Sequence, residues 1–303
     1  MSVPTKHHYL PKFFMRRWAD GAGMVTEFRR PRDLLVVKRK HISQTGYIEN
    51  LYANESKADP IERQALELIF LQKVDDAAAV ALAEIEELAG KPRDCQVCTA
   101  WSRFLMSLMH RSPERVKYLT AKVTEYESGT LNPELKEKYG DLRGPDDPSD
   151  FETWLEKQGP LAPDLRVRLL ELLIDSKRIG GTFNAMHWSV YTLEKPRFGF
   201  LTGDHPIMIS NGLGHRRGFA LLAISPVRLF IAAHDTAVLN AFNSQRPNGL
   251  EQAVNDACAR QSNHVIIGHD DAQKNFIEKR FLRQPAPVGP SGFVTWNSPL
   301  IDL

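Results

Sequence analysis

The spacing of the apolar residues changes near Gly181, and this change constrains the fold of the 303-residue chain more than any other feature. Between residues 60 and 180, apolar side chains recur every three to four positions, which predicts a central group of long helices. From residue 182 onward, short β-branched and aromatic runs alternate with glycine and proline, which predicts an antiparallel or mixed sheet. Because strands and helices do not alternate regularly, we predict an α+β fold and not a doubly wound one.

Capping residues and prolines divide the predicted helical part into separate helices. Asp59-Pro60 begins a helix that we expect to end near Gly90, Asp94 begins a second, and Ser112-Pro113 interrupts it because proline cannot continue the hydrogen-bond ladder. Four more helices are expected at residues 151–157, 165–178, 250–261 and 272–282. Strands are expected at residues 182–193, 198–201, 219–224, 228–233 and 265–267.

The N-terminus is unusually rich in large apolar groups. His8-Tyr9-Leu10-Pro11 is followed by Phe13-Phe14-Met15 and by Arg16-Arg17-Trp18, so we expect this segment to be tied into the core with a charged face left over. Asp20-Gly21-Ala22-Gly23 has turn chemistry, and residues 17–30 therefore predict a strand, a turn and a strand. This N-terminal hairpin should join or cover the later sheet.

These elements predict one α+β domain over residues 1–284. It comprises the N-terminal hairpin at 8–30, the helical part at 60–180 and the sheet-rich part at 182–284, and a C-terminal tail follows at 285–303.

Charge is unevenly distributed, although the net charge is only +2. Residues 1–40 hold ten Lys/Arg against three Asp/Glu, so the hairpin is expected to attract nucleic acid or another anionic ligand, unless it is simply a solvated basic strand pair. Cys95, Cys98 and Cys258 give no even secretory framework, and no stretch approaches the roughly 20 apolar residues of a membrane span. We therefore expect a cytoplasmic protein that does not enter a membrane.

The segment Thr202-Gly203-Asp204-His205-Pro206 follows an apolar run and predicts a sharp turn. Such a turn would project Asp204 and His205 from the end of a strand, where functional groups are often presented. An Asp that only accepts hydrogen bonds from the amides of its turn is an equally good interpretation.

This turn and the N-terminal segment resemble the bacterial domain of unknown function 4238 family. Its members typically begin with His-Tyr-x-Pro, as at His8–Pro11, and carry a Thr/Ser-x-Asp-x-Pro turn after a strand. The likeness extends to Ile224-Ser225-Pro226, to Glu62 and to Arg111-Ser112-Pro113, and so covers most of the chain. Two positions depart from the pattern: Trp18 replaces a commoner Phe, and Gly203 stands where a larger polar residue is expected. The resemblance implies no activity.

The chemically capable residues form one hypothetical site. His8, Glu62 and Asp204 are a competent ligand set for a divalent metal ion, and Arg111 could hold an anionic oxygen. With His8, Glu62, Arg111 and Asp204 as catalytic residues, the chain would be a metal-dependent phosphoester or nucleic-acid hydrolase. His205, Asn255 and Arg260 complete the polar set.

Two alternatives to this enzyme remain open. One is a non-catalytic interaction module whose basic hairpin binds nucleic acid or a protein. The other is a polar network that only locks hairpin, helices and sheet together. No His-x-x-x-His, His-Glu-x-x-His or Asp-x-Asp pattern supports a zinc site.

Overall fold

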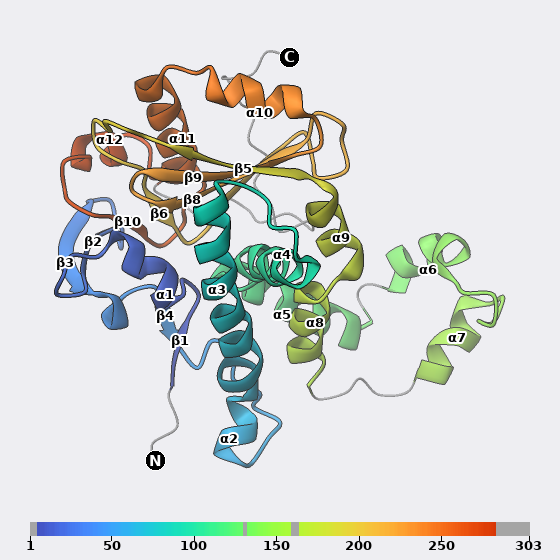
Figure 1. Cartoon of the computed structure of the whole chain (residues 1–303). Coiled ribbons are helices and arrows are strands. Elements are labelled where there is room, and N and C mark those ends of the chain that lie inside the picture. The colour runs from blue at the N-terminus through green and yellow to red at the C-terminus, as the bar shows by residue number, and fades with distance from the viewer. Residues whose placement is uncertain (1–4, 130–131, 159–163, 283–303) are drawn as a thin grey trace.

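The strands of the computed structural model, which describes residues 5–129, 132–158 and 164–282, form three antiparallel sheets (Figure 1). The first pairs β1 (Lys6–His8) with β4 (Tyr47–Glu49). The second has the order β3 (Val36–His41), β2 (Met24–Arg29), β10 (Ile266–Gly268), β6 (Thr202–Gly203). The third has the order β5 (His187–Thr192), β9 (Arg228–Ala233), β8 (Phe219–Ser225), β7 (Ile207–Ser210). Together with the helices described next, these antiparallel sheets confirm the α+β class.

The helices fall into two sets. The central set is α3 (Gln72–Leu88), α4 (Cys95–His110), α5 (Pro113–Glu127), α8 (Leu165–Ile174) and α9 (Lys177–Ala185). The outer set is α1 (Lys12–Met15), α2 (Pro60–Arg63), α6 (Asn132–Leu142), α7 (Phe151–Gln158), α10 (Thr236–Asn243), α11 (Pro247–Gln261) and α12 (Lys274–Glu278). A π-helical segment, Leu66–Leu71, leads directly into α3. No helix in the described part of the chain has both the length and the apolar character needed to cross a membrane.

Local signals set the helix boundaries as expected. The side chain of Asp94 accepts a hydrogen bond from the amide of Gln96 at the start of α4, and Ser112 Oγ accepts one from the amide of Arg115 at the start of α5. Pro113 occupies the first turn of α5, where its missing N–H costs nothing. The predicted break between α4 and α5 is therefore confirmed.

The four-stranded sheet β5-β9-β8-β7 lies inside the molecule. Figure 1 shows α10 above this sheet, with α3 and α4 below it. All seven residues of β8 are buried, as expected for a strand covered on both faces. Trp101 of α4 packs edge-on against Phe230 of β9, with ring centroids 5.5 Å apart. The main core therefore lies between this sheet and the central helices.

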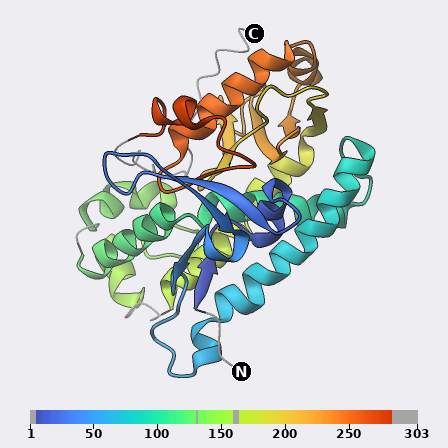
Figure 2. The same ribbon diagram turned by 90° about the vertical axis from the view of Figure 1, so that its left-hand side faces the viewer.

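The N-terminal segment is buried, as expected, but its elements differ from the prediction. Residues 13–15 belong to α1 and not to a strand, because Pro11 provides an N-cap whose carbonyl accepts the amide of Met15. The hairpin is instead formed by β2 and β3. Trp18 is 1% exposed, and its Nε1 donates to the carbonyl of Phe200, 2.8 Å away. In Figure 2, where the left-hand side of Figure 1 faces the viewer, the hairpin lies in front of the helices.

Other boundaries were wrong where tertiary packing overrides local preference. Gly180 and Gly181 lie inside α9 and do not end a helix, because α9 packs closely on α4 at Gly180 and Met106. The expected strand from residue 182 therefore begins only at His187. Residues 198–201 are not a strand, whereas 207–210 form β7, which the sequence did not indicate. The tail predicted at 285–303 lies outside the described residues.

Candidate functional site

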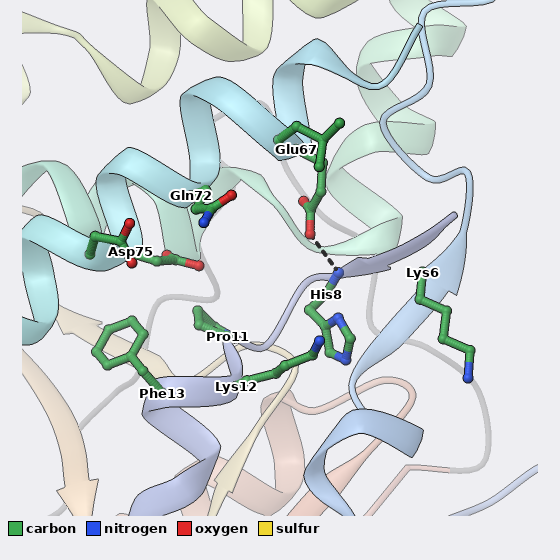
Figure 3. Close-up of a pocket in the computed structure, with 10 residues that line it drawn as sticks. Lys6, His8, Pro11, Lys12, Phe13, Glu67, Gln72 and Asp75 are labelled. Carbon is green, nitrogen blue, oxygen red and sulfur yellow. Dashed lines mark hydrogen bonds between the residues drawn. The ribbon is translucent and has the colours of Figure 1, made fainter. Parts of the chain in front are cut away.

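A pocket of about 330 Å³ opens between the N-terminal segment and the helical segment that leads into α3 (Figure 3). We name it the Glu67 pocket. Its polar lining consists of Lys6, His8, Lys12, Glu67, Gln72, Asp75 and Asp76. The volume is within the range of small-molecule sites. The pocket thus combines titratable groups from two segments that lie about sixty residues apart in the chain.

His8 reaches the pocket from β1. Pairing of β1 with β4 places His8 opposite Tyr47, whose ring lies 5.4 Å from the imidazole, centroid to centroid. Burial, reinforced by the charge of Lys12, lowers the pKa of His8 to about 4. Its Nε2 is buried and makes no hydrogen bond to any described residue. At neutral pH, His8 is therefore an uncharged imidazole with an unused polar atom.

Glu67 projects from the π-helical segment towards His8. Its Oε1 accepts a hydrogen bond from the backbone amide of His8 at 3.3 Å, drawn as a dashed line in Figure 3. Its Oε2 is buried without a hydrogen-bond partner in the part of the chain that the structure describes. Burial raises the pKa of Glu67 to about 7, although the charge of Arg111 acts in the opposite direction. This carboxyl can therefore gain or lose a proton near neutral pH.

Arg111 lies beneath the pocket and not in it. Its side chain is 1% exposed, and its guanidinium donates to both carboxylate oxygens of Asp75, at 3.2 and 2.5 Å, and to Ser107 Oγ at 2.8 Å. Burial raises the pKa of Asp75 to about 6, and the charge of Arg111 limits this rise. Two nitrogens of this buried guanidinium bind Asp75, and Arg111 is not part of the pocket lining, so the structure gives it a role in positioning Asp75 and does not present its one unpartnered nitrogen, Nε, at the pocket.

Asp204 lies apart from the Glu67 pocket. It follows β6, is 1% exposed, and accepts hydrogen bonds from the backbone amides of Asn263, His264 and Val265 at 2.9 to 3.3 Å. Burial alone would raise the pKa of Asp204, but the hydrogen bond and charge of His205, with smaller contributions from His264 and the amides, lower it overall. His8, Arg111 and Asp204 are therefore not brought together in one pocket, and the amides that Asp204 binds belong to a loop about sixty residues later in the chain and not to its own turn, as the structural alternative predicted.

Glu62 does not approach His8 or Asp204. It is exposed on α2, where its backbone amide donates to the N-cap carboxylate of Asp59 at 2.9 Å. Among residues 5–129, 132–158 and 164–282, the side chains grouped closely enough to bind a metal ion are Glu114, Asp204 and His205. The ligand set predicted from sequence, His8 with Glu62 and Asp204, is therefore not assembled, because these three residues lie on separate elements that pack in different parts of the fold.

The remaining polar candidates have internal partners. Asn255 is buried in α11, where Oδ1 accepts the amide of Leu201 at 2.8 Å and Nδ2 donates to the carbonyl of Gly199 at 2.9 Å. Arg260 is on the surface and pairs with Asp256 at 2.7 Å, one turn earlier in the same helix. Asn255 thus holds α11 against the segment before β6, and Arg260 contributes to a surface pair.

Gly203, where a larger polar residue was expected, has a packing explanation. A Cβ at this position would lie 2.9 Å from the carbonyl oxygen of Val265 and would overlap Ser262 Oγ. The short β6 strand therefore pairs with β10 only because its second residue lacks a side chain.

The basic hairpin has many of its charges paired within the molecule. Arg29 and Lys40 both lie next to the carboxylate of Glu27, which is 3% exposed, and Arg39 pairs with Asp20. A cation that is already paired with a carboxylate attracts a phosphate group less strongly. Nucleic-acid binding at this hairpin stays a prediction.

Sequence reasoning did not select Glu67 or Asp75. Glu67 is the one charged residue in the apolar run Leu66–Leu71, and a carboxylate in such a run is a usable signal of burial. Single-turn π-helical segments are also frequent at functional sites, but this one is visible only in the structure. Asp75 has no distinguishing signal, because Asp76 beside it has the same chemistry.

Comparison with known proteins gives one match. The family model described as "Protein of unknown function (DUF4238)" matches residues 6–272, which is nearly the whole chain. No curated protein and no solved structure matches it.

Proposed function

The chain belongs to the DUF4238 family of proteins of unknown function, and from the chemistry of its Glu67 pocket we propose that it is a hydrolase of small phosphoesters. The observation that carries the proposal is the pair of unused buried atoms, Glu67 Oε2 and His8 Nε2, on side chains that line one open pocket. Buried polar atoms without partners are rare in proteins and are common where a ligand supplies the missing hydrogen bond.

Glu67 is the proposed general base. A base is most effective when its pKa lies near the working pH, and the pKa of Glu67 is about 7. The carboxylate of Glu67 would take a proton from a water molecule as the water oxygen attacks phosphorus, and the P–O bond to the alcohol would break. The departing oxygen would take its proton from solvent.

The other lining residues would position the substrate. Lys12 offers an ammonium group at the pocket for the phosphate oxygens, whereas Lys6 contributes to the lining but holds its ammonium over the Tyr47 ring, 4.7 Å from the centroid. His8, held neutral by burial, offers an imidazole nitrogen that can accept a hydrogen bond from the attacking water. The Asp75–Arg111 ion pair, in which the guanidinium is buried, would hold one wall of the pocket in place.

Turnover of chromogenic phosphomonoesters and phosphodiesters by the full chain tests this function. We expect kcat/KM to rise with pH through about 7 as Glu67 ionises, and Glu67→Gln to abolish turnover. Lys12→Met should raise KM more than it lowers kcat. Glu62→Gln, at an exposed glutamate on α2, is the matched control and should retain full activity.

Two results would overturn the proposal. One is the absence of turnover for every phosphoester tested. The other is a Glu67→Gln variant that turns over substrate as fast as the unmodified protein, because the base would then lie elsewhere.

A further inference from the structure

A second group of titratable side chains lies apart from the Glu67 pocket, where three segments meet. Glu114 is in the first turn of α5, His205 follows Asp204 between β6 and β7, and His264 lies between α11 and β10. One ligand atom from each of Glu114, Asp204 and His205 lies within 4.8 Å of the other two, and His264 Nε2 contacts the carboxylate of Glu114.

The carboxylate of Asp204 lies beside the imidazole of His205. This carboxylate is fixed by the loop amides described above, and its Oδ2 lies 3.5 Å from His205 Nδ1. Histidines that bind metal ions usually direct their second ring nitrogen at a carboxylate or carbonyl in this way. The arrangement leaves His205 Nε2 directed towards Glu114, 4.0 Å from its Oε2.

The atoms that face each other across this gap are unsatisfied. His205 is 8% exposed, and its Nε2 makes no hydrogen bond to a described residue; the same is true of Glu114 Oε2. A separation of 4.0 Å is too long for a hydrogen bond. Two ligands of one tetrahedral ion, each bound at about 2.1 Å, lie roughly 3.4 Å apart, which a small side-chain movement would achieve here.

We propose that Glu114 and His205, whose ligand atoms the structure already brings together, bind one divalent transition-metal ion, that His264 turns its Nε2 from the Glu114 carboxylate to the same ion, and that Asp204 orients His205. Two imidazoles and one carboxylate are a ligand set of catalytic zinc sites, and they leave one position open. The side chain of His264 is 39% exposed, so the ion has a route from solvent. The cation would also compensate the negative charge of two carboxylates that lie close together. The proposal does not depend on the activity of the Glu67 pocket.

The test uses the full chain, first stripped of metal with a chelator. Binding of Zn²⁺ is measured by calorimetry, and binding of Co²⁺ by its visible absorption, which reports the coordination geometry. We expect one ion per chain and the intense spectrum of a four-coordinate site. Glu114→Gln and His264→Gln should each weaken Zn²⁺ binding by about tenfold or more.

His269→Gln is the matched control, because His269 is an exposed imidazole 3.1 Å from the carboxylate of Asp270 and should not contribute. Circular dichroism verifies that each variant is folded. If a variant is not folded, the Co²⁺ spectrum of the unmodified chain is used to test the proposal instead. The proposal is overturned if the unmodified chain does not bind Zn²⁺, if its Co²⁺ spectrum is that of a six-coordinate ion, or if folded Glu114→Gln and His264→Gln variants bind as tightly as His269→Gln.

Discussion

Replacing Glu67 by glutamine should change how the stability of the protein depends on pH. In the folded protein the pKa of Glu67 is about 7, against an ordinary value of 4.5. The folded state therefore holds this proton more tightly than the unfolded state does. The resulting contribution to stability is complete below pH 4.5 and is lost as the pH rises through 7.

The size of the effect follows from the shift of about 2.5 pKa units, worth about 3 kcal/mol over the whole range. Between pH 5 and 8, about 2.5 kcal/mol of this should be lost from the unmodified protein and not from Glu67→Gln. Glutamine preserves the shape of the side chain and can still accept the bond from the amide of His8. Glu67→Gln should therefore gain stability relative to the unmodified protein as the pH rises.

The measurement is urea unfolding followed by tryptophan fluorescence at pH 5 and pH 8. Groups that titrate equally in both proteins, including His8, cancel in the difference between them. Glu62→Gln, at an exposed position, provides the control for a lost glutamate charge. A stability difference for Glu67→Gln that is the same at both pH values would refute the reasoning. Such a result would mean that burial does not raise the pKa of Glu67, and that this carboxyl is not suited to act as the base near neutral pH.

The remaining predictions concern packing and burial. Asp75→Asn should lower the free energy of unfolding, measured with urea, by about 3–5 kcal/mol, because it leaves the guanidinium of Arg111 buried without its carboxylate partner. A decrease of less than about 1 kcal/mol would contradict this. Gly203→Ala should lower the free energy of unfolding by about 1–3 kcal/mol, because the added methyl group would overlap Ser262. Gly181→Ala, at a position on α9 with open space around it, should raise the free energy of unfolding by up to about 1 kcal/mol. Equal effects of the two substitutions would argue against the packing explanation. Deleting residues 1–20 should abolish cooperative thermal unfolding, because large apolar side chains between Tyr9 and Trp18 are buried in the core; an unchanged melting temperature would show that the segment is dispensable.

Much of the fold is predictable from local sequence, because short-range interactions set many element boundaries. Asp94 and Ser112-Pro113 start helices through contacts within a few residues, and the apolar run at 228–233 forms the strand predicted there. The burial of the N-terminal segment follows from its aromatic content alone. The first hairpin strand, predicted to begin at residue 17, is instead the end of a proline-capped helical turn, because such a turn and a strand look alike over so few residues.

The candidate site was predictable only in part. His8 stands out in the sequence and does line the pocket, whereas its partner Glu67 is 59 residues away. Only the packing of β1 against the segment that leads into α3 brings the two together. Glu114 had no distinguishing signal, because an acid in the first turn of a helix usually just complements the helix dipole.

Local sequence patterns are enough to specify the α+β class, the positions of the long helices and the residue types able to carry chemistry. What those residues can do depends on how the chain packs. Arg111 is locked beneath the pocket by Asp75, and Asp204 is held by the amides of a distant loop. Glu67 acquires a pKa of about 7 through burial. The physical reason is that desolvation and hydrogen bonding depend on neighbours that folding brings from other parts of the chain, and these neighbours set the protonation and reach of each side chain.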